Sequence, residues 1–525
     1  MKYDYDIVFC AIPYSEVSQM YSAPAILKSI VEHEGFKAKA HDFGIDLYKF
    51  CEHKFEKFST IQNYFINDDD SLNKEDRAML DEFYQLIIQW LKDHPARFIG
   101  LSVFSFYTHK CCIELLRLIK QAGIESKIVL GGRGCKVPIS WNHSAEVVLG
   151  KQDTKTYFGE LLVNEGLADH VIIGDGEDAV INLLKGKEVK LENTTDTFAY
   201  PVPDYSDYEV DAYKWDDNGP MIPITGSKGC VRNCDFCDVR FHFGKYQFRT
   251  GENIANEMIS LNKKHGYRKF QFTDSLVNGS LKVMKEFCVV MAKHNDSNPG
   301  NKIYWNGQYI CRPLGQTPEE IYPLMKRAGG EGLTVGAESG SIHVLSHMNK
   351  KTTSLALFAE MEMFQKYGLT CSLLTFVGHW AEKHENFLEH CKMLVDLVPY
   401  IKSGTVSAIS LGIPAMLFPG TPAMKEVDRG DVVRLENHKP EVFWYAKYNP
   451  QNTFKERAIR RLIVYQIAAR MGIPASNELD YIMGLNTMIK QGYKKINDFY
   501  EKCRRDSTQL RTSNDLAGSR AKISN

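Results

Sequence analysis

The chain has 525 residues, of which 64 are Lys or Arg, 65 are Asp or Glu, and 44% are hydrophobic. This length exceeds what one hydrophobic core serves, so we expect two to four domains. The balanced charge gives no strong signal for binding nucleic acid or an anionic membrane. We see no signal peptide and no apolar run of the ~18 residues that a membrane span needs. The 13 scattered cysteines do not suggest a disulfide framework, which favours a cytoplasmic location.

Residues 1–200 predict an α/β domain with a Rossmann-like, doubly wound parallel sheet. Short apolar runs, typical of buried strands, alternate there with longer segments that are typical of helices and end in glycine. Such sheets bind ligands at the carboxyl ends of their strands. The expected strands include 6–12, 97–106 and 127–132, and the expected helices include 22–35 and 109–123.

Two glycine turns follow expected strands of this domain. They are Gly131-Gly132 and the segment Gly174-Asp175-Gly176-Glu177. Glycine lets the backbone approach a ligand closely, but connections between strands and helices also use it for tight turns. From the residues alone, both interpretations stand.

A linker with prolines at 201–218 precedes a second α/β segment over 219–425. About six strand–helix units follow one another in it, which predicts a partial (β/α)6 TIM barrel with its site at the C-terminal ends of the strands. Residues 426–510 are expected to be mostly helical, and 511–525 to form a disordered tail. For the basic stretch at 455–461 we expect a solvated helix face.

Three cysteines lie close together near the start of the second segment, in the sequence GSKGCVRNCDFCDVR. Cys230, Cys234 and Cys237 have the spacing C-x3-C-x2-C, and Phe236 precedes the last of them. Three thiolates can hold three irons of a [4Fe–4S] cluster and leave the fourth iron open. The alternatives are a zinc site, to which His242 would add a ligand, and a chance grouping.

The cysteine loop resembles that of the radical SAM superfamily, and the whole arrangement resembles its cobalamin-binding, class B methyltransferase-like branch. In that branch, a Rossmann-like cobalamin-binding domain precedes a partial TIM barrel that carries the cysteine loop. The resemblance covers about residues 5–425 and includes VLGGRGC, DHVIIGDGEDAVINLL, PVPDYSDY and GLTVGAESGSIHVLSHMNK. It implies reductive cleavage of S-adenosylmethionine (SAM) to methionine and a 5′-deoxyadenosyl radical.

The resemblance also implies roles for individual residues, beginning with ligation of the cluster by the three cysteines. For Asp274 and Arg312, an ordinary salt bridge at the barrel rim is an equal alternative to SAM binding. The residues implied for SAM are Phe236, Asp274, Ser275, Gln308, Arg312, Glu338 and Ser339. The residues implied for cobalamin are Ser102, Gly131, Gly132, Gly174, Gly176 and Glu177.

Three departures from the family pattern bear on cobalamin affinity and on the substrate. The first domain lacks an Asp-x-His-x-x-Gly motif, so a histidine axial ligand to cobalt is not expected. The usual Arg-Gly-Cys-Pro-Tyr reads Lys228-Gly229-Cys230-Val231-Arg232 here. The paired glycines continue as Arg133-Gly134 in place of Pro-His.

The sequence therefore predicts a radical SAM enzyme, and we favour a cobalamin-dependent methyltransferase that acts on an unactivated carbon. One alternative is a radical SAM enzyme that catalyses a cyclisation, rearrangement or oxidation without methyl transfer from cobalamin. Another is a non-catalytic zinc-binding or scaffold protein. The expected partners are an electron donor such as flavodoxin or ferredoxin and a small-molecule or peptide substrate that the sequence does not specify.

Overall fold

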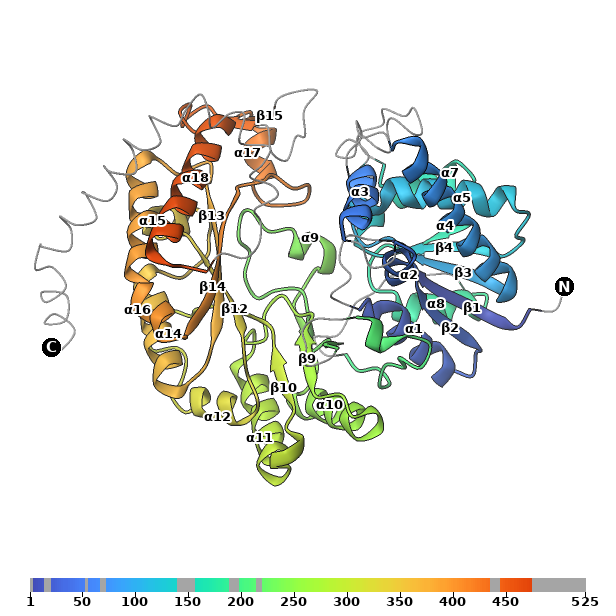
Figure 1. Cartoon of the computed structure of the whole chain (residues 1–525), viewed down its shortest axis with the longest axis horizontal. Coiled ribbons are helices and arrows are strands. Elements are labelled where there is room, and N and C mark those ends of the chain that lie inside the picture. The colour runs from blue at the N-terminus through green and yellow to red at the C-terminus, as the bar shows by residue number, and fades with distance from the viewer. Residues whose placement is uncertain are drawn as a thin grey trace, which may run out of the picture. The chain divides into compact units, whose positions relative to one another are not determined.

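Figure 1 shows the structure, a computed structural model. The contacts within the chain divide it into two compact units. The first comprises Met1–Gly229 and His242–Thr273, and the second comprises Cys230–Phe241 and Asp274–Asn525. The predicted domain boundaries stay a prediction. The structure describes residues 3–13, 20–51, 55–66, 72–138, 156–187, 198–213, 220–434 and 444–474.

A five-stranded parallel sheet forms the core of the first unit (Figure 1). Its strands lie in the order β2 (Ala38–Asp42), β1 (Tyr5–Ala11), β3 (Ala96–Ser102), β4 (Lys127–Gly131) and β5 (His170–Val171). The helices described in this unit before the linker are α1 (Ser22–His33), α2 (Phe43–Phe50), α3 (Phe55–Ile66), α4 (Lys74–Asp93), α5 (His109–Gln121), α7 (Phe158–Asn164) and α8 (Glu177–Leu184).

Helices cover both faces of this sheet. Successive residues of a strand point to opposite faces, and β1 shows this clearly. Ile7 and Phe9 pack with residues of α1 and α8, whereas Val8 and Cys10 pack with residues of α2 to α5. The predicted doubly wound parallel sheet is therefore confirmed.

The main sheet of the second unit is also parallel. It contains β11 (Gln308–Tyr309), β12 (Leu333–Glu338), β13 (Cys371–Val377) and β14 (Val406–Pro414), in that order. Its helices include α11 (Leu281–Ser297), α12 (Ile321–Arg327), α13 (Ile342–His347), α14 (Ser354–Tyr367), α15 (His384–Asp396) and α16 (Val398–Lys402).

The six strands expected for the barrel are all present, with one change. The strand expected at 302–310 is divided into β10 (Tyr304–Asn306) and β11. The first two strands, β6 (Ile222–Ile224) and β9 (Lys269–Phe272), pair in parallel within the first unit. Because the expected strands belong to two units, their closure into a partial barrel stays a prediction.

The C-terminal region differs from the prediction where the structure describes it. An antiparallel pair, β15 (Val432–Arg434) and β16 (Trp444–Ala446), occurs in the region that was expected to be mostly helical. The helix α18 (Phe454–Met471) packs against β14 and α15. Its Arg457, Arg460 and Arg461 are buried, so the expectation of a solvated face at 455–461 is wrong.

The tail expected at 511–525 lies outside the described residues. None of the helices that the structure describes is long and apolar enough to cross a membrane.

Candidate functional site

The three cysteines lie in a loop between β7 (Ser227–Lys228) and α9 (Val239–Phe243). Cys234 is buried, and Cys230 and Cys237 are half-buried. The backbone N–H of Cys237 donates to the carbonyl of Cys234 at 3.2 Å, which closes a tight turn between them. Burial raises the pKa of Cys234 to about 12 and that of Cys237 to about 11. Binding to a metal overcomes such a rise, because the thiolate is the ligand.

Glu338, at the end of β12, has an unusual backbone conformation. Its φ of 59° lies in the left-handed region that residues other than glycine rarely adopt. The pairing of β12 with β13 also shifts register between Gly336 and Glu338. Such strain persists where the surrounding structure enforces it, and it is frequent at functional sites.

The carboxylate of Glu338 is buried against Lys350, which ends the segment GLTVGAESGSIHVLSHMNK and has no predicted role. Lys350 Nζ lies 2.5 Å from Glu338 Oε1, and both side chains are almost fully buried. The ammonium lies 5.9 Å from the Phe236 ring centroid. Its charge opposes the effect of burial on the pKa of all three cysteines. The structure thus places a cation beside the cysteine loop.

The remaining residues predicted for SAM also belong to the second unit. Asp274 and Ser339 are buried, Ser275 and Arg312 are half-buried, and Gln308 is exposed. Arg312 donates to the carbonyls of Asn278 and Gly279 at 2.6 and 2.8 Å, and so holds the loop that follows β9. Ser339 Oγ accepts a hydrogen bond from the backbone N–H of Ser341 at 3.2 Å. The SAM roles of these residues stay predictions.

The Phe236 side chain anchors the cysteine loop. Its ring packs edge-on against Phe376, with 5.0 Å between centroids. Both rings contact the apolar cluster of Val344, Leu345 and Met348, which belong to α13 and the residue after it. The side chain is therefore committed to packing, so the SAM role predicted for Phe236 would fall to its backbone.

The six residues predicted for cobalamin belong to the first unit. Ser102 and Gly131 are paired neighbours at the carboxyl ends of β3 and β4. A Cβ added to Gly131 would meet nothing within 4 Å, whereas one added to Gly132 would lie 2.5 Å from the carbonyl oxygen of Val103. The φ of 102° at position 132 is a conformation that favours glycine, so the backbone there requires Gly132. Gly131 is the position with room beside it.

Glu177 opens α8, just after the turn that contains Gly174 and Gly176. Its carboxylate lies 2.5 Å from Lys228 Nζ, and Asp175 lies 3.5 Å from the same ammonium. Lys228 is one of the residues that depart from the family pattern. Its charge is balanced by the carboxylates of Asp175 and Glu177, in the segment predicted to face cobalamin.

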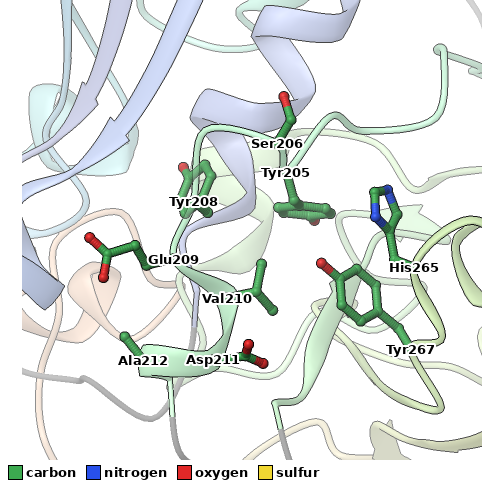
Figure 2. A pocket seen from close by; sticks show the side chains of 9 residues that line it. All are labelled: Tyr205, Ser206, Tyr208, Glu209, Val210, Asp211, Ala212, His265 and Tyr267. Carbon is green, nitrogen blue, oxygen red and sulfur yellow. The ribbon is translucent and has the colours of Figure 1, made fainter.

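A separate pocket of about 560 Å³ lies in the first unit (Figure 2). Tyr205 and Tyr208 form part of its wall, but their hydroxyls donate to the carbonyls of Pro223 and Tyr21. None of the predicted site residues lines it. The lining residues are Tyr205, Ser206, Tyr208, Glu209, Val210, Asp211, Ala212, His265 and Tyr267.

Comparison with protein families and curated proteins identifies related sequences. The family model of the radical SAM superfamily matches residues 224–394. The chain is 22% identical over 271 residues to an anaerobic magnesium-protoporphyrin IX monomethyl ester cyclase of Synechocystis sp., covering 47% of this chain and 53% of the relative. It is 23% identical over 334 residues to a bacteriochlorophyllide d C-12(1)-methyltransferase of Chlorobaculum tepidum, covering 61% and 68%. The chain thus spans little more than half of the cyclase's length.

Two solved structures share the fold across nearly the whole chain. TsrM from Kitasatospora setae, a radical SAM methyltransferase with cobalamin and a [4Fe-4S] cluster bound, is 15% identical with a TM-score of 0.63. The match covers 96% of this chain and 100% of TsrM. OxsB, a cobalamin-dependent SAM radical enzyme with aqua-cobalamin bound, is 16% identical with a TM-score of 0.60, covering 97% and 72%. At these identities the likeness shows the fold, and it confirms the predicted α/β class.

Proposed function

We propose that the chain is a cobalamin-dependent radical SAM methyltransferase whose radical SAM domain includes residues 224–394, where the family model matches. The observation that carries the proposal is the presence of a C-x3-C-x2-C loop and a doubly wound parallel sheet in one chain with the fold of TsrM and OxsB. When bound, the cluster with SAM supplies radical chemistry and cobalamin supplies methyl transfer, while the protein positions them.

The residues around the cysteine loop fit such a cluster. Cys230, Cys234 and Cys237 would each hold one iron, and two of these residues are only half-buried. The Lys350 ammonium favours the anionic form of thiolate ligands. Since Lys350 contacts Oε1 of Glu338, we assign Oε2 of Glu338 as the acceptor for a polar hydrogen of SAM.

The first experiment tests the cluster. After anaerobic reconstitution with iron and sulfide, we expect about four irons per chain and absorbance near roughly 400 nm. Each single Cys→Ala variant at 230, 234 or 237 should abolish release of 5′-deoxyadenosine from SAM. The matched control is Cys288→Ala, at a buried cysteine of α11, which should keep the irons. A triple alanine variant that still binds the irons and cleaves SAM would contradict the assignment.

The second experiment tests cobalamin. The purified protein should take up hydroxocobalamin in equimolar amount, and Gly131→Trp should block this uptake without changing the iron content. Gly132 is unsuitable for this test, because any side chain there would meet the Val103 carbonyl. Gly300→Trp, at an open position of the second unit, is the control. If cobalamin is never retained while SAM is still cleaved, the methyltransferase proposal fails.

A second candidate is a radical SAM cyclase that uses no methyl transfer. It is favoured by the name of the cyclase from Synechocystis sp. and of two further relatives. Labelled SAM separates the two candidates even without a substrate. Transfer of label from the SAM methyl group to protein-bound cobalamin is expected for the methyltransferase and not for the cyclase.

A further inference from the structure

Asp235, the residue between Cys234 and Phe236, is held through its backbone and its side chain. Its N–H donates to the carbonyl of Met348 at 3.0 Å, and its carbonyl accepts from the N–H of Ala423 at 2.9 Å. Its carboxylate Oδ2 lies 3.0 Å from Nε2 of His379. A loop residue next to a predicted cluster ligand is thus fixed by three other segments of the second unit.

The hydrogen bonds of His379 decide which ring nitrogen carries the proton. The backbone N–H of Ala381 donates to Nδ1 at 3.2 Å, so Nδ1 is an acceptor. In a neutral imidazole the proton is then on Nε2, which donates it to Asp235. The ring is fully buried, and its own loop is held by Asn452, whose Nδ2 donates to the carbonyls of Gly378 and His379.

Asp235, His347 and His379 also place potential metal ligands within 4.8 Å of one another. A metal would need the lone pair of His379 Nε2, and a metal-bound histidine almost always donates from its other ring nitrogen. Here the other nitrogen accepts a hydrogen bond instead. His347 Nδ1 lies 3.6 Å from Asp235 Oδ2, a longer contact than the 3.0 Å between Asp235 and His379. The geometry therefore favours a hydrogen-bonded pair over a metal centre.

We propose that Asp235 and His379 form a positioning pair that fixes the shape of the cysteine loop for cluster binding. This inference rests on the proposed function. Cys234 is bonded covalently to Asp235, and its carbonyl accepts from Cys237, so a shift of Asp235 displaces two of the three thiols. Through Asn452, the pair also connects the C-terminal region to the cysteine loop. Asp235 and His379 act through the loop and are not cluster ligands.

The test uses the full chain without metal, so that it does not depend on the cluster. Asp235→Ala removes the acceptor, whereas Asp235→Asn keeps an oxygen that accepts from His379 Nε2. Val231→Ala is the control, because it shortens an exposed side chain of the same loop and leaves the pair in place. In Asp235→Ala, hydrogen exchange of the loop amides at 230–241 should accelerate by about tenfold or more, the loss expected for a bond to a charged group. The other two variants should exchange as the unmodified chain does.

A second measurement follows reconstitution of the cluster. Asp235→Ala should alter the electron paramagnetic resonance line shape of the reduced cluster, and Asp235→Asn should restore it. A failure of the unmodified chain to bind iron would contradict the proposed function, while the exchange rates of the metal-free chain would still decide the positioning pair.

Unchanged loop exchange in Asp235→Ala would overturn the positioning pair, and so would equal acceleration in Asp235→Asn. If Asp235→Ala does not fold, His379→Ala and His379→Gln provide the same comparison, since the glutamine amide keeps an N–H donor. Zinc titration of the triple cysteine-to-alanine variant tests the metal alternative. Stoichiometric zinc binding that His379→Gln abolishes would replace the positioning pair by a metal centre.

Discussion

Glu338 and Lys350 form an ion pair that is nearly inaccessible to water. Removing two charges from water is costly, so such a pair contributes little net stability while both members are present. Removal of one member leaves the other charge buried and uncompensated. Each residue of the pair therefore depends on the other.

This dependence gives a prediction for stability. Lys350→Met should destabilise the second unit by about 3–5 kcal/mol, because Glu338 would be left buried and unpaired. The double variant Lys350→Met/Glu338→Gln should recover most of that loss, since no charge remains. Urea unfolding of Lys350→Met, Glu338→Gln and the double variant measures the coupling energy between the two residues. Additive losses would contradict it.

His390, in α15, gives a prediction for pH dependence. It is fully buried, and neither ring nitrogen has a hydrogen-bond partner among the described residues. Burial lowers its pKa to about 4. Since the ordinary pKa is about 6.5, the unfolded chain binds the proton more readily than the folded chain between these values. Stability is therefore lost as the pH falls from about 6.5 to about 4, by up to roughly 1.4 kcal/mol per pH unit.

His390→Leu should remove this part of the pH dependence. It should also stabilise the protein at neutral pH by about 1–3 kcal/mol, because an unsatisfied polar group leaves the core. The measurement is urea unfolding of both proteins at about pH 7.5 and about pH 5.5. An identical loss of stability on acidification in the two proteins would show that His390 does not titrate as described.

At the scale of elements, α18 fixes the loop that follows β13. Arg460 donates to the carboxylate and the carbonyl of Glu382, at 2.8 and 3.1 Å. Arg457 stacks on Trp444, with its guanidinium carbon 3.8 Å from the ring centroid. The basic stretch at 455–461, for which a solvated face was expected, is thus buried and holds the loop that carries His379.

We expect Arg460→Met to destabilise the second unit by about 3–5 kcal/mol, because Glu382 is fully buried and would lose its counter-charge. The control is Lys293→Met, at an exposed lysine of α11 in the same unit, which should change stability by less than about 0.5 kcal/mol. Unfolding in urea compares the two. Equal effects of the two variants on stability would show that Arg460 is solvated, as the sequence suggested.

At the scale of the whole molecule, the two predicted cofactor sites belong to units with separate cores. We therefore expect uptake of the two cofactors to be independent. The triple cysteine-to-alanine variant should still bind hydroxocobalamin, and Gly131→Trp should still bind about four irons. Iron analysis and the cobalamin absorbance of each variant measure this. Loss of both cofactors in either variant would show that uptake is coupled.

The sequence by itself determined the local features. Apolar runs and glycine-terminated helices predicted β1, β3, α1 and α5, because their periods report which faces are buried. The spacing of the three cysteines predicted the candidate cluster loop, because ligands that are close in sequence are close in space. The capping residue Asn73, whose Oδ1 accepts from the Asp76 N–H, was an unused signal for α4.

Only the tertiary structure decided the long-range partners. Lys350 lies twelve positions after its partner Glu338. Asp235 contacts His379, which follows the end of β13, and Arg460 of α18 contacts Glu382. Lys350 and Asp235 lie within the quoted motifs, but the motifs do not reveal their partners, because a charged side chain has the same pattern whether water or a buried counter-charge solvates it. Which of the two it meets is fixed when the chain packs, and these residues hold the cysteine loop and the strand ends around it.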